Sequence, residues 1–351
     1  MEQSISKKIS VFKWILTLGI VAYHARWIYG YSITYTSTVD QWLLNGYVDF
    51  ANHLGFVSMT FFFFTSGFFF YNRLENMSGL KKKIKSRVNS LIVPFVLWNI
   101  ALICYFSMKG EVELSLYNLC DYFFFEPLAG PLWYLLALFL LILVAPVFVY
   151  FKEKKKINTI LFLILITVCL LRLSGYIPTI MSYKRWWWYP NIISYLPFYL
   201  VGAYLGMYYP KLVLDNTYAD KKFSYIGLVL IVISFLLWNL HNSESMYAYY
   251  SFIELVGLWL LVKADWFTKE TPKVFSCSFY IYALHNQVLI PLYREYSQRI
   301  LYSLDISVSG AQMILVKIIE LFTIVIICLG LKFLAKIIFS DKIYYGLTGG
   351  R

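Results

Sequence analysis

The sequence has few charged residues for its length. Only 14% of its 351 residues are Asp, Glu, Lys or Arg, whereas a water-soluble domain usually carries about 25%. Hydrophobic residues make up 60% of the chain, and many stand in runs of about 20, the length of a membrane-spanning helix. This composition excludes an ordinary soluble protein. It predicts an all-α, polytopic membrane protein, because the backbone polar groups of a helix are satisfied within lipid.

The motifs of metal, redox and nucleotide chemistry are missing as well. The sequence contains no HExxH, P-loop or GxGxxG motif, and its five cysteines are too far apart to form CxxC. We therefore expect no metal site and no redox cofactor. The cysteines are expected to be small core residues, with a Cys104–Cys120 disulfide outside the membrane as the alternative.

Ten apolar runs are candidates for membrane spans. They cover approximately residues 11–29, 52–72, 88–107, 131–151, 157–174, 191–209, 223–240, 249–266, 275–293 and 312–339. If the spans alternate in direction, the segments on the side of the N-terminus hold 23 Lys and Arg residues and the opposite segments hold seven. Because Lys and Arg accumulate in cytoplasmic loops, we expect both termini in the cytoplasm.

The same distribution accounts for the net charge of +12 without a nucleic-acid partner. Three lysines, Lys7, Lys8 and Lys13, stand before or at the start of the first run, as in a signal peptide, but no small-residue cleavage site follows, so this span is expected to be retained. We expect a single integral-membrane domain over residues 1–351, without a soluble domain, in contact with membrane lipids.

Five ionisable residues within the predicted spans are taken as candidates, because an ionisable residue costs roughly 2.5–3.5 kcal/mol at a helix centre. They are His24, Glu254, His285, Lys317 and Glu320. Lys317 and Glu320 are spaced to neutralise each other on one helix, and Glu254 lies near the outer half of its span. For these three, a structural role is favoured over a direct one.

The two histidines are the stronger candidates for chemistry. Lys13 and His24 are 11 residues apart, which places them on one helix face about 16 Å apart. His285 is at a similar depth in a span that also begins on the cytoplasmic side, so both histidines can line one cavity. A neutral imidazole at this depth can act as a general base. The alternative for either residue is a hydrogen-bonded packing role.

A basic segment, Leu80-Lys81-Lys82-Lys83-Ile84-Lys85-Ser86-Arg87, leads into a span that contains Pro94. It can contact anionic lipid, or it can form a phosphate clamp at the mouth of a cavity. Spacing alone favours the lipid contact.

Six motifs in order resemble the acyltransferase 3 family of integral membrane acyltransferases over nearly the whole chain. Lys13 and His24 match the family's Arg, ten residues, His pattern. Four further motifs follow, matched by Phe61 to Phe68 with its Ser66-Gly67 pair, by Arg87 with Leu91-Ile92-Val93-Pro94, by Leu132-Trp133-Tyr134-Leu135, and by Leu196 to Gly202. The last is Ile281-Tyr282-Ala283-Leu284-His285. The chain departs from the family at Lys13, where Arg is preferred, and at Ser90, which replaces the second Arg of an Arg-x-x-Arg pattern.

The resemblance implies transfer of an acyl group, usually acetyl from cytoplasmic acetyl-CoA, to a hydroxyl or amine of a cell-surface glycan or lipid-linked saccharide. It also implies the plasma membrane of a bacterium. Cationic residues are then expected to bind the CoA phosphates, His24 to act as base or to form an acyl intermediate, and His285 to orient His24 or bind the acceptor. The expected phosphate-binding residues are Lys13, Lys83, Lys85 and Arg87, and the expected acceptor-binding residues are Trp133, Tyr134 and Ser66.

Two other classes of function fit the sequence. A transporter or flippase also needs ten spans and a polar cavity, although the sequence shows no clear pair of matching Gly- or Pro-broken spans. The chain can also be a binding subunit of a glycan-biosynthesis complex. Whether it forms a homodimer, and whether a second protein completes transfer outside, is left open.

Overall fold

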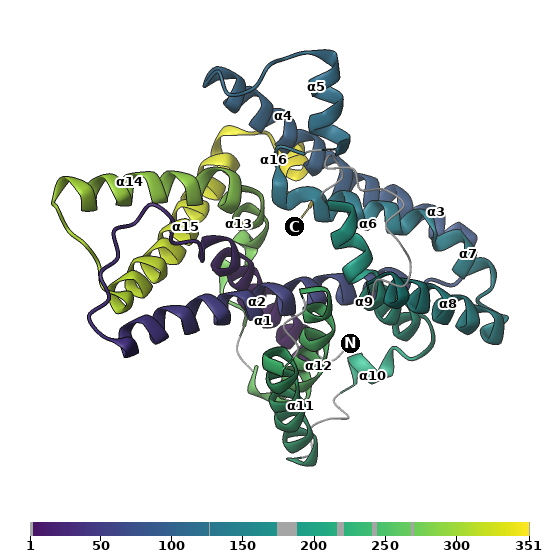
Figure 1. The fold of residues 1–351 in the computed structure, drawn as a ribbon. Helices are drawn as coiled ribbons and strands as arrows, with labels where there is room; N and C mark the ends of the chain where they lie inside the picture. Colours follow the sequence, from purple (N-terminus) through teal and green to yellow (C-terminus); the bar gives the residue numbers. More distant parts are fainter. Residues whose placement is uncertain are drawn as a thin grey trace.

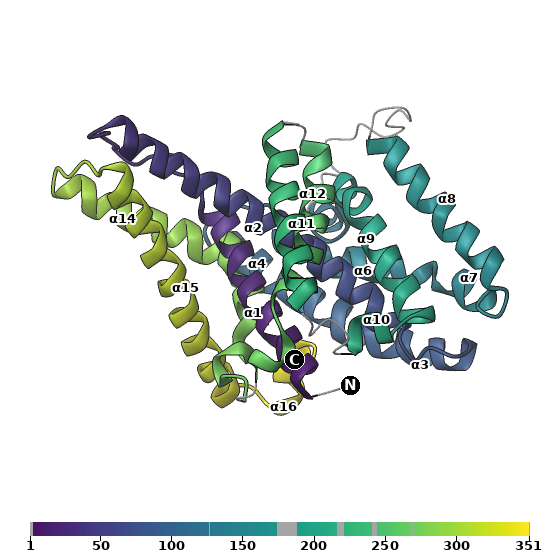
Figure 2. The same ribbon diagram turned by 90° about the horizontal axis from the view of Figure 1, so that it is seen from below.

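The computed structural model describes residues 3–125, 127–173, 188–215, 221–240, 244–267 and 270–350 (Figures 1 and 2). Within these residues the chain is almost entirely helical, and its one β-type contact is an isolated bridge between Ile33 and Val308. The predicted all-α class is confirmed for these residues. Helix α2 (Thr38–Tyr71) passes through the middle of the fold and packs on α1 (Gln3–Ala25), α9 (Trp188–Tyr208), α12 (Glu244–Leu261) and α15 (Gly310–Ile338).

The remaining α-helices are shorter or more peripheral. They are α3 (Met77–Arg87), α4 (Val93–Met108), α5 (Leu116–Cys120), α6 (Trp133–Leu143), α7 (Ala145–Tyr150), α8 (Lys155–Leu173), α10 (Lys211–Leu214), α11 (Lys221–Leu240), α13 (Ser278–Leu284), α14 (Ile290–Ser303) and α16 (Asp341–Thr348). Three π-helical turns, η1 (Val88–Ile92), η2 (Asp121–Phe125) and η6 (His285–Leu289), and three 3-10 turns, η3 (Gly130–Leu132), η4 (Ala264–Trp266) and η5 (Lys273–Cys277), complete the described chain.

Five helical segments among the described residues are long and apolar enough to cross a membrane. They are Thr38–Tyr71, Met77–Met108, Gly130–Tyr150, Lys221–Leu240 and Gly310–Ile338. Helices α8, α11 and α15 expose large apolar side chains such as Leu163, Val229 and Phe322, as expected of surfaces that face lipid. Each of the ten predicted ranges overlaps helical residues in the described part of the chain, but ten crossings remain a prediction.

Both chain ends lie on the same side of the molecule as α3 and α10 (Figure 2). The basic segment of α3 is therefore on the side of the termini, as the predicted topology requires. That this side is cytoplasmic remains a prediction from the distribution of Lys and Arg.

Helix α2 begins 14 residues before the predicted span. Ser37 caps it by accepting a hydrogen bond from the backbone N–H of Asp40 at 3.1 Å. The Asp40 carboxylate in turn accepts from the backbone N–H groups of Gly310 and Ala311, both at 2.8 Å, and so ties α2 to the start of α15. Residues 38–51, outside the predicted span, are thus helical, and a search for apolar runs does not detect them because it does not read helix caps.

Glycines bring α2 and α9 into backbone contact. A Cβ atom placed on Gly67 of α2 would lie 2.1 Å from the carbonyl oxygen of Tyr199, and one on Gly202 of α9 would lie 2.1 Å from that of Phe64. Gly206 meets the carbonyl of Phe68 in the same way, at 2.3 Å. The Ser66-Gly67 and Gly202 motifs of the sequence therefore join two helices at a distance that only glycine permits.

Two helices are interrupted in the same manner. The backbone N–H of Val93 donates to the carbonyl of Val88, and that of Ile290 donates to the carbonyl of His285. Each acceptor is five residues before its donor, one residue more than in an α-helix. In each case a proline, Pro94 or Pro291, stands two residues after the π-helical turn and lacks the N–H that would continue the ladder. The sequence search for matching broken spans did not detect this pair.

The predicted cysteine chemistry can also be compared with the structure. All five cysteines are free thiols, and Cys104 and Cys120 are exposed without a disulfide between them. The disulfide alternative is therefore wrong for this structure, and Cys169, Cys277 and Cys328 are buried as small core residues.

Candidate active site

Helices α1 and α13 bring the two predicted histidines together. His24 lies in the last turn of α1, and His285 follows directly after α13 and opens the π-helical turn η6. Their ring centroids are 5.1 Å apart, with the ring planes inclined by 54°. Two residues that are 261 positions apart in the sequence therefore lie side by side.

The two rings have different surroundings. His285 is fully buried, and its Nδ1 atom lies 2.9 Å from the carbonyl oxygen of Ile281 and 3.1 Å from that of Tyr282. His24 is only partly buried and meets the ring of Tyr23 edge to face at 5.1 Å. His285 is thus fixed in the protein interior, while His24 keeps access to a neighbouring space.

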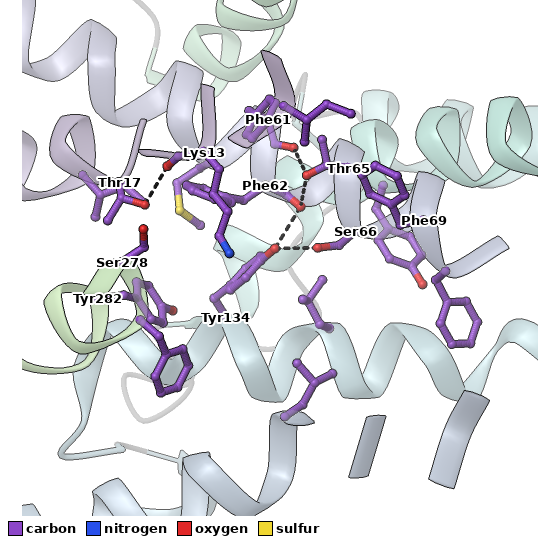
Figure 3. Close-up of a pocket in the computed structure, with 18 of the residues that line it drawn as sticks. Lys13, Thr17, Phe61, Phe62, Thr65, Ser66, Phe69, Tyr134, Ser278 and Tyr282 are labelled. Carbon is purple, nitrogen blue, oxygen red and sulfur yellow. Dashed lines mark hydrogen bonds between the residues drawn. The ribbon is translucent and has the colours of Figure 1, made fainter. Parts of the chain in front are cut away.

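A cavity of about 330 Å³ lies between α1, α2, α6 and α13 (Figure 3). Two cations, Lys13 of α1 and Arg87 of α3, are among its lining residues, and the described part of the lining contains no carboxylate. The side chain of Lys13 points into the cavity toward Tyr134. Apolar side chains form most of the remaining wall, including Met59 and Leu138. Such a cavity suits a molecule with anionic groups and a less polar arm.

Hydroxyl groups form the polar part of this wall. Tyr134 donates from its hydroxyl to the carbonyl of Phe62 at 2.8 Å, and Ser66 lies 2.7 Å from the same hydroxyl (Figure 3). Because Tyr134 has one proton to give, Ser66 is the donor to Tyr134. Tyr282, which also lines the cavity, donates its hydroxyl to the carbonyl of Pro131.

The cavity ends one helical turn from the histidine pair. Ile20 lines it and lies four residues before His24 on α1, while Tyr282 lines it and lies three residues before His285. The ring centroids of Tyr282 and His285 are 6.4 Å apart. Lys13 lies on the same helix as His24, 11 residues nearer to its start, so α1 carries a cation in the cavity wall and an imidazole one turn beyond that wall.

Five predicted site residues lie outside this lining, and His24 and His285, which were expected to line one cavity, are two of them. Lys83 donates to the carbonyls of Phe70 at 2.6 Å and Asn72 at 2.7 Å, where it caps the end of α2. Lys85 is exposed on α3, and Trp133 is only 8% exposed in the core, its ring 6.0 Å from that of Phe63. Of the predicted set, the cavity brings together Lys13, Arg87, Ser66 and Tyr134.

Sequence reasoning missed several polar lining residues. Thr17, Thr65 and Ser278 face the cavity, but single hydroxyl residues within apolar runs carry no distinctive pattern. Thr17 lies four residues after Lys13, and this helical spacing could have identified it. Tyr282 was inside the quoted Ile281–His285 motif and could have been chosen on that ground.

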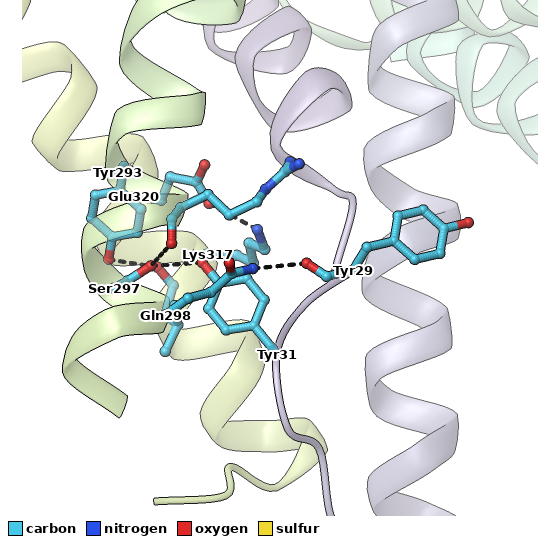
Figure 4. Close-up of polar contacts among 9 residues, drawn as sticks. Tyr29, Tyr31, Tyr293, Ser297, Gln298, Lys317 and Glu320 are labelled. Carbon is cyan, nitrogen blue, oxygen red and sulfur yellow. Dashed lines mark hydrogen bonds and ion pairs between the residues drawn. The ribbon is translucent and has the colours of Figure 1, made fainter. Parts of the chain in front are cut away.

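The other ionisable residues of the spans form separate pairs. Lys317 and Glu320 are 1% and 0% exposed, and Lys317 Nζ lies 2.9 Å from Glu320 Oε2, as their spacing predicted. Tyrosines and Ser297 surround this pair between α14 and α15 (Figure 4). Glu254 pairs instead with His53 of α2, a residue that sequence analysis overlooked, at 3.6 Å.

Metal ligands do not gather anywhere in the described residues, where no group of three or more His, Cys, Asp or Glu side chains is found. No curated protein and no solved structure matches the chain. The family model described as an acyltransferase domain matches residues 6–335, a range that holds both histidines and all the residues of the cavity. The chain therefore belongs to the acyltransferase 3 family of membrane acyltransferases.

Proposed function

We propose that the protein transfers an acyl group, acetyl in the simplest case, from cytoplasmic acyl-CoA to a hydroxyl or amine of a glycan or lipid-linked saccharide. The observation that carries this proposal is the cavity that is lined by Lys13 and Arg87 and by residues one turn from each of the two adjoining histidines. Family membership supports the reaction type.

The cavity suits an acyl-CoA donor in both charge and shape. Lys13 and Arg87 would bind the phosphates, and Arg87 can bind a phosphate through two parallel hydrogen bonds. The apolar wall and the hydroxyls of Ser66 and Tyr134 would accommodate the amide-containing arm of CoA, with the thioester directed toward His24. Lys83 and Lys85 would contribute positive potential near the mouth without lining it.

In the proposed reaction His24 is the general base. It takes the proton of the acceptor hydroxyl while that oxygen attacks the thioester carbonyl, and the carbon–sulfur bond then breaks. The leaving thiolate takes the proton from His24, so the products are the acyl ester and free CoA. His24 can alternatively carry the acyl group itself before the acceptor attacks. His285 assists His24 in both cases.

Transport of a polar solute without covalent chemistry is the competing function. The two π-helical turns followed by Pro94 and Pro291 favour it, because transporters often bind their substrates at broken helices. The unequal roles of the two breaks count against it, since the η6 turn carries His285 and the η1 turn carries no ionisable residue.

Purified protein in lipid nanodiscs, incubated with radiolabelled acetyl-CoA and a panel of bacterial glycans, distinguishes these functions. Release of CoA with label in the acceptor is the expected result. Release of neither, together with uptake of a glycan or lipid-linked saccharide into proteoliposomes, would establish transport and overturn the proposal. Glycan mass spectrometry of cells with and without the protein then identifies the acceptor.

A further inference from the structure

The contacts of His285 assign the ring proton of its neutral form to the Nδ1 atom. Its two neighbours within hydrogen-bond distance are the carbonyl oxygens of Ile281 and Tyr282, at 2.9 and 3.1 Å. Carbonyl oxygens only accept hydrogen bonds, so Nδ1 must donate. In a neutral imidazole, one nitrogen carries the proton and the other a lone pair. The lone pair of His285 is therefore on Nε2.

This Nε2 lone pair has no hydrogen-bond partner among the described residues, although His285 is fully buried. A buried polar atom without a partner is rare in folded proteins and points to a function or to a partner that arrives later. The ring of His24 is a candidate for that partner, because its centroid is 5.1 Å from that of His285. A single N–H···N hydrogen bond fits this separation, and a small rotation of the partly exposed His24 ring completes it.

We propose that His285 is a positioning residue that accepts a hydrogen bond from one ring nitrogen of His24 through Nε2. His24 is thereby held in the tautomer whose second nitrogen is unprotonated and directed at the reacting groups. This inference rests on the proposed acyl transfer, in which His24 needs a lone pair to take the acceptor's proton.

The surroundings of His285 make it suitable for this task. The ring cannot turn over without losing both carbonyl contacts, and the π-helical turn that begins at His285 sets those carbonyls around it. A neutral acceptor also avoids placing a carboxylate in the membrane beside His24, where a second charge would be costly. When His24 takes up the proton, its second N–H remains bonded to His285, which stabilises the charged ring.

Two amide variants separate positioning from packing. In His285→Asn the amide nitrogen occupies the place of Nδ1 and keeps a bond to Ile281 or Tyr282, but nothing replaces the acceptor at Nε2. In His285→Gln the side chain reaches the place of Nε2 and offers an oxygen that accepts. We expect kcat of the Asn variant to fall by about 10² to 10⁴, with an unchanged KM for acyl-CoA, and the Gln variant to recover at least about tenfold.

Equal activities of the Asn and Gln variants, or an Asn variant within about threefold of wild type, would overturn the proposal while leaving the acyltransferase function intact. If the Asn variant does not fold, nitrogen NMR of wild-type protein labelled with ¹⁵N-histidine decides. A protonated Nδ1 and an unprotonated Nε2 on His285 support the proposal, and the opposite tautomer excludes it. Absence of acyl transfer by wild type would instead refute the proposed function, and the NMR result would still stand.

Discussion

Two regions place ionisable side chains inside apolar helices, and they differ in how those side chains are paired. Lys317 and Glu320 form an ion pair at 2.9 Å, with Lys317 also 5.1 Å from the ring centre of Tyr31 (Figure 4). His24 and His285 stand 5.1 Å apart, and His285 Nε2 has no partner in the described structure. Neither Lys317 nor Glu320 lines the cavity at Lys13, whereas residues one turn from each histidine do. The contact between Lys317 and Glu320 compensates two buried charges, whereas the lone pair on His285 Nε2 is available for chemistry.

The largest effect should come from His24. His24→Gln should lower acyl transfer by about 10² to 10⁴ while acyl-CoA binding persists, because an amide cannot take up a proton at neutral pH. His24→Ala should behave alike and still insert, since it removes a polar group from a span. Steady-state kinetics and donor binding on the purified variants measure this.

His53→Gln is the matched control, because His53 is also a helical histidine but pairs with Glu254 and lies outside the cavity. It should retain wild-type turnover. A His24→Gln enzyme that kept more than about a tenth of the activity would remove His24 from the role of base and make His285 the leading candidate.

Substitutions at Lys317 and Glu320 should change the stability of the protein and not its turnover. Lys317→Met leaves the buried carboxylate of Glu320 without its partner and should destabilise the protein by about 3–5 kcal/mol. Replacing both residues, as Lys317→Met with Glu320→Leu, should restore most of that loss, because neither charge is then buried. Thermal unfolding in detergent gives the comparison. Equal instability of single and double variants would contradict the ion-pair account.

Substitution of Arg87 should have an effect of intermediate size. Arg87→Ala should raise the KM for acyl-CoA roughly tenfold and leave kcat nearly unchanged, because contacts remote from the thioester supply uniform binding. Lys82→Ala, on the exposed face of the same helix, is the control and should change neither constant. Lys83→Ala should instead lower thermal stability, since Lys83 caps the carbonyls at the end of α2. An unchanged KM for Arg87→Ala would assign α3 to lipid contact alone.

Tyr134 should give the smallest effect. Tyr134→Phe removes the hydroxyl that joins Ser66 to the Phe62 carbonyl and should cost about 0.5–1.5 kcal/mol of stability, with a few-fold rise in KM. Ser66→Ala should give a similar change, and the double variant should cost less than the sum because the two groups share one hydrogen bond. Additive losses in the double variant would show that the groups act independently.

The sequence predicted the helical class, the shared face of Lys13 and His24, and the Lys317–Glu320 pair, because helix periodicity and apolar length determine all three. It did not predict that Lys83 would cap α2, since a long cation can contact lipid, phosphate or a carbonyl from the same position. The partnership of His53 with Glu254 was equally invisible, because it joins two helices whose packing is set by distant contacts.

The two π-helical turns were missed for a related reason. A search for apolar runs treats Pro94 and Pro291 as tolerated residues within spans, whereas the structure changes the hydrogen-bond pattern ahead of each. The sequence predicted only the approximate depth of His285 within its span. Its orientation depends on the local turn, which sets the carbonyls of Ile281 and Tyr282 around Nδ1.

The glycine contacts between α2 and α9 limit how this protein can move. Where the backbone at Gly67 and Gly202 meets the carbonyl of the facing helix, no side chain lies between them that could change rotamer to absorb sliding. The two helices must either shift together or separate, and separation would lose the close backbone packing. Entry and exit of substrates must therefore rely on motion of the opposite wall, where α1 and α13 meet through side chains and the chain after α13 already departs from regular α-helix.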